Sequence, residues 1–282
     1  MKGRVKLMLE LTEAVVLAKQ LNESIRGKKV KNVIAAGSQH KFAWFYKDPQ
    51  SYPGMLTGKI VGDSKNYGGH LEITVEDTVL LFSDGATLRY FETNEKRPLK
   101  HQLFIEFEDL SSLCVTIQMY GGIWCFPAGE FDNPYYLIAK EKPSPLSDRF
   151  DEAYFYQMIN ATGMDKLSAK AFLATEQRIP GLGNGVLQDI LYYAGIHPKK
   201  KVKEFEEDEK RRLYHTLRTT LQEMIRLGGR DTEKDLFGNP GGYKTNASKN
   251  TVDQPCPSCG SLIKKEAYLG GSIYYCGGCQ SM

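Results

Sequence analysis

Residues 256–279 read CPSCGSLIKKEAYLGGSIYYCGGC and hold four of the six cysteines of the chain. These cysteines are Cys256, Cys259, Cys276 and Cys279. Two residues separate the members of each pair, which lets a tight turn aim both sulfurs at one metal ion. Sixteen residues separate the pairs and make a hairpin, for which Gly270-Gly271 fits the turn. Four thiolates complete a tetrahedron without water, so the spacing predicts a zinc ribbon with one structural Zn²⁺.

The length of this tail also favours a metal, because about thirty residues cannot build a hydrophobic core alone and a metal ion replaces one. Two disulfides or free thiols are the alternative interpretations of the four cysteines. Disulfides are rare in a chain that no secretory signal precedes. The remaining cysteines, Cys114 and Cys125, lie in apolar, strand-like stretches, so we expect them to be small buried hydrophobic residues.

A second informative stretch, residues 176–198, reads EQRIPGLGNGVLQDILYYAGIHP. Its apolar residues recur at intervals of three and four, which predicts a helix with Asn184 as N-cap and Gly195 as C-cap. A glycine-rich turn that opens a helix exposes backbone N–H groups able to bind a phosphate oxygen. An ordinary turn between two helices is the alternative, and the stretch alone does not separate the two.

Hydrophobic periodicity divides the chain into three parts. Helical spacing over 11–25 and period-two alternation over 28–126 predict one helix followed by antiparallel strands in a sandwich or barrel. The stretch 141–148 contains two prolines and two serines and is interpreted as a linker, after which the period becomes 3.6. We therefore predict an α+β, multidomain fold, with a β-sandwich domain at 1–142, a helical domain at 143–250 and a zinc finger at 251–282.

Composition excludes several classes of protein. The 282 residues are 41% hydrophobic and 25% charged, which argues against collagen, a coiled coil and gross disorder. No apolar run approaches the ~18 residues of a membrane helix, and no secretory signal opens the sequence, so we expect an intracellular protein without membrane contact. Residues 199–250 carry 13 basic against 9 acidic side chains, a local excess compatible with a polyanionic partner.

Together these segments resemble the formamidopyrimidine-DNA glycosylase and endonuclease VIII family. Residues 176–198 are similar to its helix-two-turn-helix segment, the cysteine tail to its zinc finger, and LELTEA at 9–14 to its amino-terminal motif; LSDRF at 146–150 and KHQLFIEFED at 100–109 also fit. The resemblance implies damaged double-stranded DNA bound between two domains, extrusion of the damaged base, cleavage of its glycosidic bond and scission at the abasic site. Extrusion is required because an active site cannot reach the target atoms of a base that is stacked inside the duplex. We expect such a protein to be a cytoplasmic monomer, associated with the nucleoid in a bacterium.

The resemblance also assigns chemistry, and here the sequence departs from the family. The family's nucleophile is an amino-terminal amine, usually that of a proline, which attacks the sugar C1′ and forms a Schiff base. The matching residue is Leu9, whose internal amide nitrogen is delocalised and cannot do so. Translation from Met8 or cleavage before Leu9 would restore an amine, and Lys6 offers another. Glu10 and Glu13 match the positions of the family's acid/base residues. The alternative is a structural role, in which both carboxylates stabilise the N-terminus of the helix through its dipole.

Two cationic phosphate contacts of the family are missing. Gly271 stands where the resemblance places an arginine of the zinc finger, and Gly69 where it places a lysine of a strand. A glycine offers no charged side chain, so we expect weaker DNA binding with a flatter salt dependence. Lys264 and Lys265 are candidates to compensate in part.

Other DNA contacts are implied by matching positions. Gly183 and Asn184 match the family's phosphate-binding turn. Tyr120 matches an aromatic wedge, and Met119 the side chain that fills the gap left by the extruded base; ordinary strand residues are the alternative for both. The polar stretch 231–255 corresponds to the base-recognition loop, and its segment 238–243 is a candidate lid.

Three functions follow from these observations. The first is a DNA glycosylase that uses Glu10, with or without lyase activity and with an impaired Schiff-base step. The second is a member of the family that binds DNA or lesions without catalysis. The third is a zinc-stabilised scaffold with a protein partner.

Overall fold

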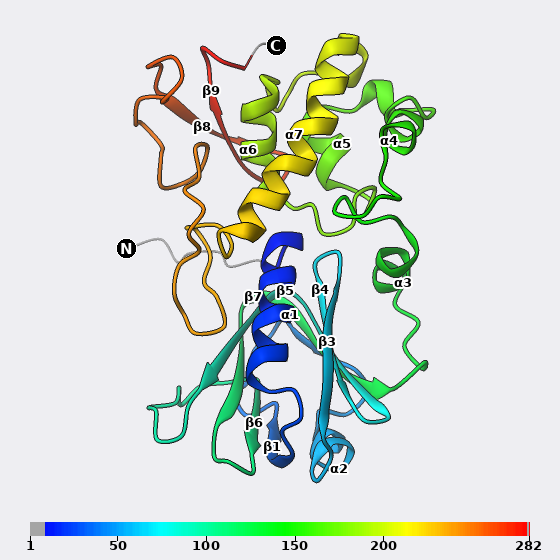
Figure 1. Cartoon of the computed structure of the whole chain (residues 1–282), viewed down its shortest axis with the longest axis vertical. Helices are drawn as coiled ribbons and strands as arrows, with labels where there is room; N and C mark the ends of the chain where they lie inside the picture. Colours follow the sequence, from blue (N-terminus) through cyan, green and yellow to red (C-terminus); the bar gives the residue numbers. More distant parts are fainter. Residues whose placement is uncertain (1–8, 281) are drawn as a thin grey trace.

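The structure is a computed structural model that describes residues 9–280 and 282. It has two lobes, a sheet lobe and a helical lobe that ends in a small hairpin (Figure 1). The helices are α1 (Leu11–Ser24), α2 (Tyr52–Leu56), α3 (Pro134–Glu141), α4 (Glu152–Ile159), α5 (Ala169–Ala174), α6 (Val186–Ala194) and α7 (Glu207–Arg226). The strands are β1 (Val30–Ala35), β2 (Ala43–Phe45), β3 (Val61–Tyr67), β4 (His70–Val75), β5 (Thr78–Phe91), β6 (Leu103–Phe107), β7 (Ser112–Pro127), β8 (Ile263–Tyr268) and β9 (Gly271–Cys276).

Strands β1 to β7 form one sheet in the order β1-β6-β7-β5-β4-β3, and β2 adds to β7 in parallel. The other pairs are antiparallel. Strands β5 and β7, with 14 and 16 residues, run the whole length of the sheet and shift register between Asp84 and Ala86. A bulge of this kind bends both strands. The expected α+β class with mainly antiparallel strands is confirmed; where a β-sandwich was predicted, the seven strands pair as one continuous sheet.

Helix α1 connects the two lobes. Its first residue, Leu11, packs into the core of the helical lobe, whereas Ala14, Leu17 and Leu21 pack into the core of the sheet lobe. The helix predicted over 11–25 is confirmed and ends at Ser24. Because one helix contributes to both cores, the lobes are held by buried apolar contact as well as by chain connectivity.

Helix α6 is confirmed, but its predicted N-cap is wrong. Gly185 occupies the N-cap position, and Asn184 makes no capping hydrogen bond. Instead, the carboxylate of Glu10 accepts the N–H groups of Gly185 (2.8 Å) and Val186 (2.7 Å). A carboxylate brought from the other end of the chain satisfies the helix N-terminus, which leaves the Asn184 side chain for another contact. The predicted C-cap, Gly195, is confirmed.

Strands β8 and β9 form the predicted hairpin over the cysteine tail. Tyr268 pairs with Gly271, so the turn consists of Leu269 and Gly270, with φ angles of 47° and 71°. Two left-handed residues make the two-residue turn that matches the twist of a hairpin. The turn expected at Gly270-Gly271 is therefore displaced by one residue, because Gly271 already begins β9.

The polar stretch 231–255 contains no long helix or strand but is attached to both lobes. The carboxylate of Asp189 on α6 accepts the N–H groups of Asn246 and Ala247. On the sheet side, Arg89 donates to the carbonyl oxygen of Phe237 (2.9 Å). The stretch passes beside α1, as its orange trace shows (Figure 1). None of the helices in the described part of the chain is long and apolar enough to cross a membrane.

Candidate functional site

A cavity of about 500 Å³ lies between the two lobes. The sheet lobe contributes Leu9, Glu10 and Tyr120 to its wall, and the helical lobe contributes Gly183 and Asn184. These five residues were all singled out from the sequence. The structure therefore brings the amino-terminal motif, the glycine-rich turn and one residue of the predicted wedge to one place.

Glu10 is buried where the lobes meet. Its two oxygens accept backbone N–H groups at the start of α6, and Oε2 lies 3.5 Å from Nη2 of Arg230. A side chain at Gly183 would clash with Glu10, because its Cβ would lie 2.4 Å from Oε1. Burial raises the pKa of Glu10, whereas the charge of Arg230 lowers it. A carboxyl group with a raised pKa beside a cavity has the properties of a general acid or base.

Glu13 has a structural partner. Its carboxylate forms a bidentate ion pair with Arg230, with Nε–Oε1 and Nη2–Oε2 distances of 2.9 and 2.8 Å. Both side chains are more than nine-tenths buried, and Glu13 does not line the inter-lobe cavity. Nearby Glu233 is also buried, and burial raises its pKa to about 8. The ion pair with Arg230 and the absence of Glu13 from the cavity wall therefore favour a structural role for Glu13 over a catalytic one.

The glycines of the β3–β4 turn bear on one position at which the sequence departs from the family that it resembles. A Cβ at Gly69 would lie 2.7 Å from the carbonyl oxygen of Leu9, and a Cβ at Gly181 would lie 2.3 Å from the nitrogen of Gly69. The turn and the loop before α6 thus meet backbone to backbone. A lysine at position 69 would have no room, so this position serves the packing of the two lobes.

The backbone around Leu9 is fixed by the sheet. The N–H of Leu9 donates to the carbonyl oxygen of Asp84 (2.6 Å), which lies at the bulge of β5 with a φ of +55°. His70, also in the cavity wall, is buried, and its Nδ1 has no hydrogen-bond partner among the described residues. Burial lowers the pKa of His70, while the charge of Asp84 raises it. Lys6 and Met8, the other candidates for an amine, lie outside the described residues.

A cation lies beside Gly271, where the resemblance had suggested a lost charge. A Cβ at Gly271 would lie 3.4 Å from Nζ of Lys170 on α5 and 3.5 Å from Nδ2 of Asn184. Nδ2 of Asn184 donates to the carbonyl oxygen of Ser272 (2.9 Å), and Nζ of Lys170 to that of Tyr268 (2.5 Å). Lys170 is buried, and no ion pair to it is found in the part of the chain that the structure describes. Burial lowers its pKa.

The lysines that follow α6 are partly held in ion pairs, which leaves fewer of them to contact DNA phosphates. Lys199 pairs with Glu266 on β8, and Lys200 forms a buried ion pair with Glu209 (2.7 Å). Lys264 and Lys265 on β8 are exposed. The Nζ of Lys264 lies near the backbone of Gly277 in the second cysteine turn, not at Gly271.

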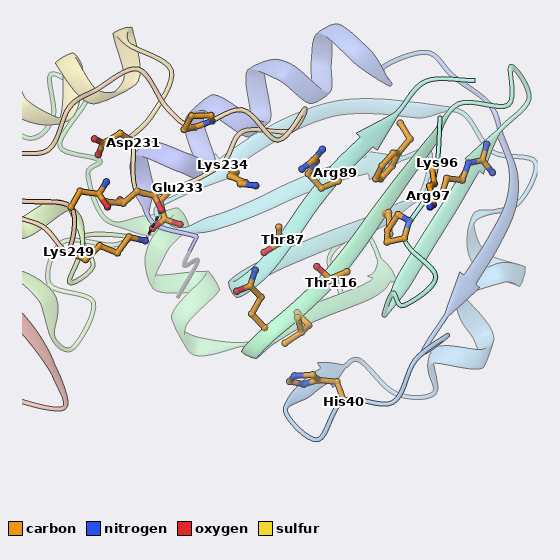
Figure 2. A pocket seen from close by; sticks show the side chains of 18 residues that line it. His40, Thr87, Arg89, Lys96, Arg97, Thr116, Asp231, Glu233, Lys234 and Lys249 are labelled. Carbon is orange, nitrogen blue, oxygen red and sulfur yellow. Dashed lines mark hydrogen bonds between the residues drawn. The ribbon is translucent and has the colours of Figure 1, made fainter. Parts of the chain in front are cut away.

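A second, larger cavity of about 1020 Å³ lies between the sheet and the stretch 231–250 (Figure 2). Thr87 and Arg89 of β5 and Thr116 of β7 form its sheet wall, and Glu233 and Lys249 face them across the opening. Its lining carries five lysines and arginines against two acidic residues. The corresponding side chains are Arg89, Lys96, Arg97, Lys234 and Lys249, against Asp231 and Glu233.

The four cysteines of the tail converge as their spacing predicted. Their sulfur atoms all lie within 4.8 Å of one another, with Cys256–Cys279 and Cys259–Cys276 distances of 3.7 and 3.3 Å. A tetrahedral ion with metal–sulfur bonds of ~2.3 Å places its sulfurs about 3.8 Å apart. The cluster can therefore hold a metal ion. The hydroxyl group of Tyr192 on α6 lies 3.1 Å from Sγ of Cys256 and links this centre to the helical lobe.

Sequence reasoning missed several residues of this site. Arg230 and Lys170 lie in polar or helical stretches with no local motif, and only the fold brings them to Glu13 and Gly271. Trp44 on β2 lies against Tyr120, with ring centroids 5.7 Å apart. Cys114 and Cys125, by contrast, are buried free thiols as expected.

Comparison with known proteins gives consistent results. Residues 142–235 match the formamidopyrimidine-DNA glycosylase H2TH domain. The formamidopyrimidine-DNA glycosylase of Prochlorococcus marinus strain MIT 9312 is 29% identical over 197 residues, which cover 67% of this chain and 66% of that protein. That of Psychromonas ingrahamii is 28% identical over 281 residues, which cover 97% and 100%.

Solved structures have the same fold. The Lactococcus lactis Fpg in complex with DNA containing an abasic site superposes with a TM-score of 0.81 at 23% identity, covering 97% of this chain and 100% of that one. The MutM (Fpg) protein of Thermus thermophilus gives 0.78 at 22% identity, covering 96% and 98%. The likeness extends over both lobes and the hairpin.

Proposed function

Because this chain belongs to the formamidopyrimidine-DNA glycosylase and endonuclease VIII family, we propose that it binds damaged duplex DNA between its lobes and releases oxidised bases by cleaving the N-glycosidic bond. The observation that carries this proposal is that Glu10 and Asn184 line one inter-lobe cavity, while Lys170 and Asn184 both lie next to Gly271. The solved complex of the similar L. lactis protein with abasic-site DNA supports the same partner. Such a protein acts in base excision repair, at the chromosome inside the cell.

The phosphate contact is assigned to the place where β9 meets α5 and α6. Lys170 supplies a positive charge and Asn184 an amide donor beside the backbone of Gly271, which carries no side chain. A charge and a neutral donor hold a phosphate oxygen without reading sequence. Lys170 thus replaces, from a neighbouring helix, the cation that position 271 lacks. Gly183 and Lys264 have smaller parts: Gly183 gives room to Glu10, and Lys264 adds positive charge to the hairpin.

The extruded base is assigned to the cavity under the stretch 231–250. This cavity lies beside β5 and β7, and Pro240 of the predicted lid is part of its lining. It is larger than the roughly 300 Å³ at which ligand pockets begin. Its excess of basic side chains favours the electron-rich oxygens of an oxidised base and the phosphate next to it.

Glu10 is assigned to the chemistry. With its pKa raised by burial, it exchanges a proton at a pH closer to neutral than a free carboxyl group does. It protonates the departing base or the sugar oxygen, or activates the attacking water. The Arg230–Glu13 pair positions it by holding α1 against the helical lobe.

The metal of the cysteine cluster is proposed to be zinc, one ion per chain. The sulfur distances fit a four-coordinate tetrahedral site, and four thiolates leave no position for water or substrate. The ion would therefore stabilise the β8–β9 hairpin, which carries Gly271 to the phosphate contact. The boundaries 1–142, 143–250 and 251–282 and a monomeric state remain part of the same proposal.

A second function, lesion binding without catalysis, has one observation in its favour. The nitrogen of Leu9 is a peptide N–H bonded to Asp84, and both oxygens of Glu10 are occupied by backbone donors. In that case the fold would hold an extruded nucleotide without reacting with it. The third possibility, a scaffold for a protein partner, finds no support in the comparisons.

One experiment distinguishes these functions. The full chain is incubated with duplexes that carry an oxidised purine or an abasic site, and base release, strand scission and borohydride-trapped adducts are measured. We expect base release that Glu10→Gln abolishes and that Glu223→Gln, an exposed carboxylate on α7, leaves unchanged. A chain without residues 1–8 tests whether a free amine at Leu9 produces the adduct. Retarded duplex without base release would establish the binding function, and no retardation at low salt would refute both.

A further inference from the structure

An exposed aromatic surface adjoins the inter-lobe cavity. It consists of Phe42, Trp44, Met119 and Tyr120, which we call the aromatic ledge. Phe42, Trp44 and Met119 are 48%, 45% and 37% exposed, and the ledge forms one side of an open hollow of about 650 Å³. Large apolar side chains that gather on a surface indicate a binding partner more often than single ones do.

The ledge is held rigidly by the sheet. Strand β2 pairs in parallel with β7, so that Trp44 lies opposite Gly122. The N–H of Gly121 also donates to the carbonyl oxygen of Phe42 (3.0 Å). The rings of Trp44 and Tyr120 lie 5.7 Å apart at an interplanar angle of 36°. A partner therefore meets two rings that are already in place and loses little conformational entropy in ordering them.

Two features indicate a nucleobase as this partner. Trp44 and Tyr120 line both the hollow and the inter-lobe cavity, so the ledge continues the surface assigned to DNA. The other residues around the hollow are His40, Lys41 and Gln118, and none of the hollow's lining residues carries a carboxylate. An aromatic floor with a basic rim suits a flat, aromatic group attached to a phosphate chain.

We propose that Trp44, together with Tyr120, stacks the base that loses its partner when the damaged nucleotide is extruded. The proposal rests on the duplex binding proposed above and adds a positioning residue on β2. Tyr120 and Met119 were assigned to a wedge by resemblance, whereas nothing assigned Trp44. Stacking on this pair stabilises the opened duplex and favours a purine over a pyrimidine in the opposite strand, because the larger base covers more of the two rings.

The test uses a duplex with a tetrahydrofuran abasic analogue opposite 2-aminopurine, whose fluorescence falls when it stacks. The chain contains two tryptophans, so Trp124→Phe provides a background in which protein fluorescence reports Trp44 alone. We expect binding to quench both signals. Trp44→Ala should restore the 2-aminopurine signal and weaken binding of this duplex by about tenfold, the order expected for one base stacked on an aromatic ring. Trp44→Phe should retain most of the effect, and Ile60→Ala, an exposed apolar residue on the sheet lobe, all of it.

The outcomes separate this inference from the proposed function. If the parent protein binds the duplex and Trp44→Ala binds it equally well with 2-aminopurine still quenched, the inference is wrong and the function stands. Equal weakening on a fully paired duplex would show a general groove contact and would also overturn it. A change of oligomeric state in Trp44→Ala would identify a second copy of the chain as the occupant instead. A parent protein that binds no duplex refutes both.

Discussion

Replacement of Arg230 by methionine tests how the two lobes are joined. Arg230 contacts Glu13 through two hydrogen bonds of 2.9 and 2.8 Å and lies 3.5 Å from Glu10. All three side chains are more than nine-tenths buried. The guanidinium group is therefore the counter-ion of two carboxylates that come from the first turn of α1 and its N-cap position. Methionine keeps much of the volume and removes only the charge and the donors.

The magnitude follows from burial. Removing one partner of a buried ion pair costs about 3–5 kcal/mol because the other charge is left uncompensated. Here two carboxylates lose their counter-ion, so the upper half of that range is expected. Such a loss is a large fraction of the roughly 5–15 kcal/mol that stabilises a typical protein. The double variant Arg230→Met/Glu13→Leu should lose less than the sum of its single changes, since it also removes one of the orphaned charges.

Urea unfolding at pH 7 measures this loss with two probes. Both tryptophans, Trp44 and Trp124, lie on the sheet lobe, so fluorescence follows that lobe, whereas far-ultraviolet circular dichroism follows mainly the helices. In the parent protein we expect coincident transitions. In Arg230→Met the midpoint should fall in both signals, and the transitions should separate because the lobes are less strongly coupled.

An exposed pair on the preceding helix supplies the control. Arg226 and Glu223 also form a close ion pair (2.7 Å), but their side chains are 67% and 44% exposed. Arg226→Met should therefore leave the free energy of unfolding almost unchanged. The reasoning is refuted if Arg230→Met has as small an effect, or if its two transitions remain coincident at an unchanged midpoint.

Three further results are expected. Lys170→Met should weaken duplex binding and reduce the slope of log K against log salt by about 0.9, whereas exposed Lys19→Met on α1 should leave the slope unchanged. Cys276→Ser should lower the bound zinc, measured by mass spectrometry of the native protein, from about one per chain to none, and should lower the melting temperature. Glu233 has its pKa raised from 4.5 to about 8, so the folded protein keeps a proton that the unfolded chain releases between these values. Stability should therefore fall as pH rises through this window by up to about 1.4 kcal/mol per pH unit, and Glu233→Gln should flatten this dependence.

Local patterns in the sequence predicted much of the fold. The period-two alternation, the helix over 11–25, the helix before Gly195 and the cysteine spacing each depend on neighbours within one turn or one hairpin. The structure confirms all four. The residues Leu9, Glu10 and Asn184 were placed together by resemblance, and one cavity contains them all.

What local patterns could not predict depends on contacts between distant segments. Asn184 was expected to cap α6 because an asparagine at that place usually does, but Glu10 arrives from 175 residues away and takes both N–H groups. Arg230 could not be recognised as the partner of Glu13, nor Lys170 as the neighbour of Gly271. No periodicity encodes such pairs, since each requires both lobes to be assembled.

The two glycines at positions where the resemblance places cations illustrate why a missing motif residue is weak evidence of lost function. At Gly69 a side chain would collide with the carbonyl oxygen of Leu9, so this glycine allows the lobes to pack at a distance that a lysine would prevent. At Gly271 a Cβ would make ordinary contact with Nζ of Lys170 at 3.4 Å, so the proposed phosphate contact takes its charge from Lys170. The electrostatic part of the affinity for a phosphate depends on the field at the phosphate, to which a cation on a neighbouring helix also contributes. The salt dependence of Lys170→Met therefore decides whether the second glycine is a loss or an exchange.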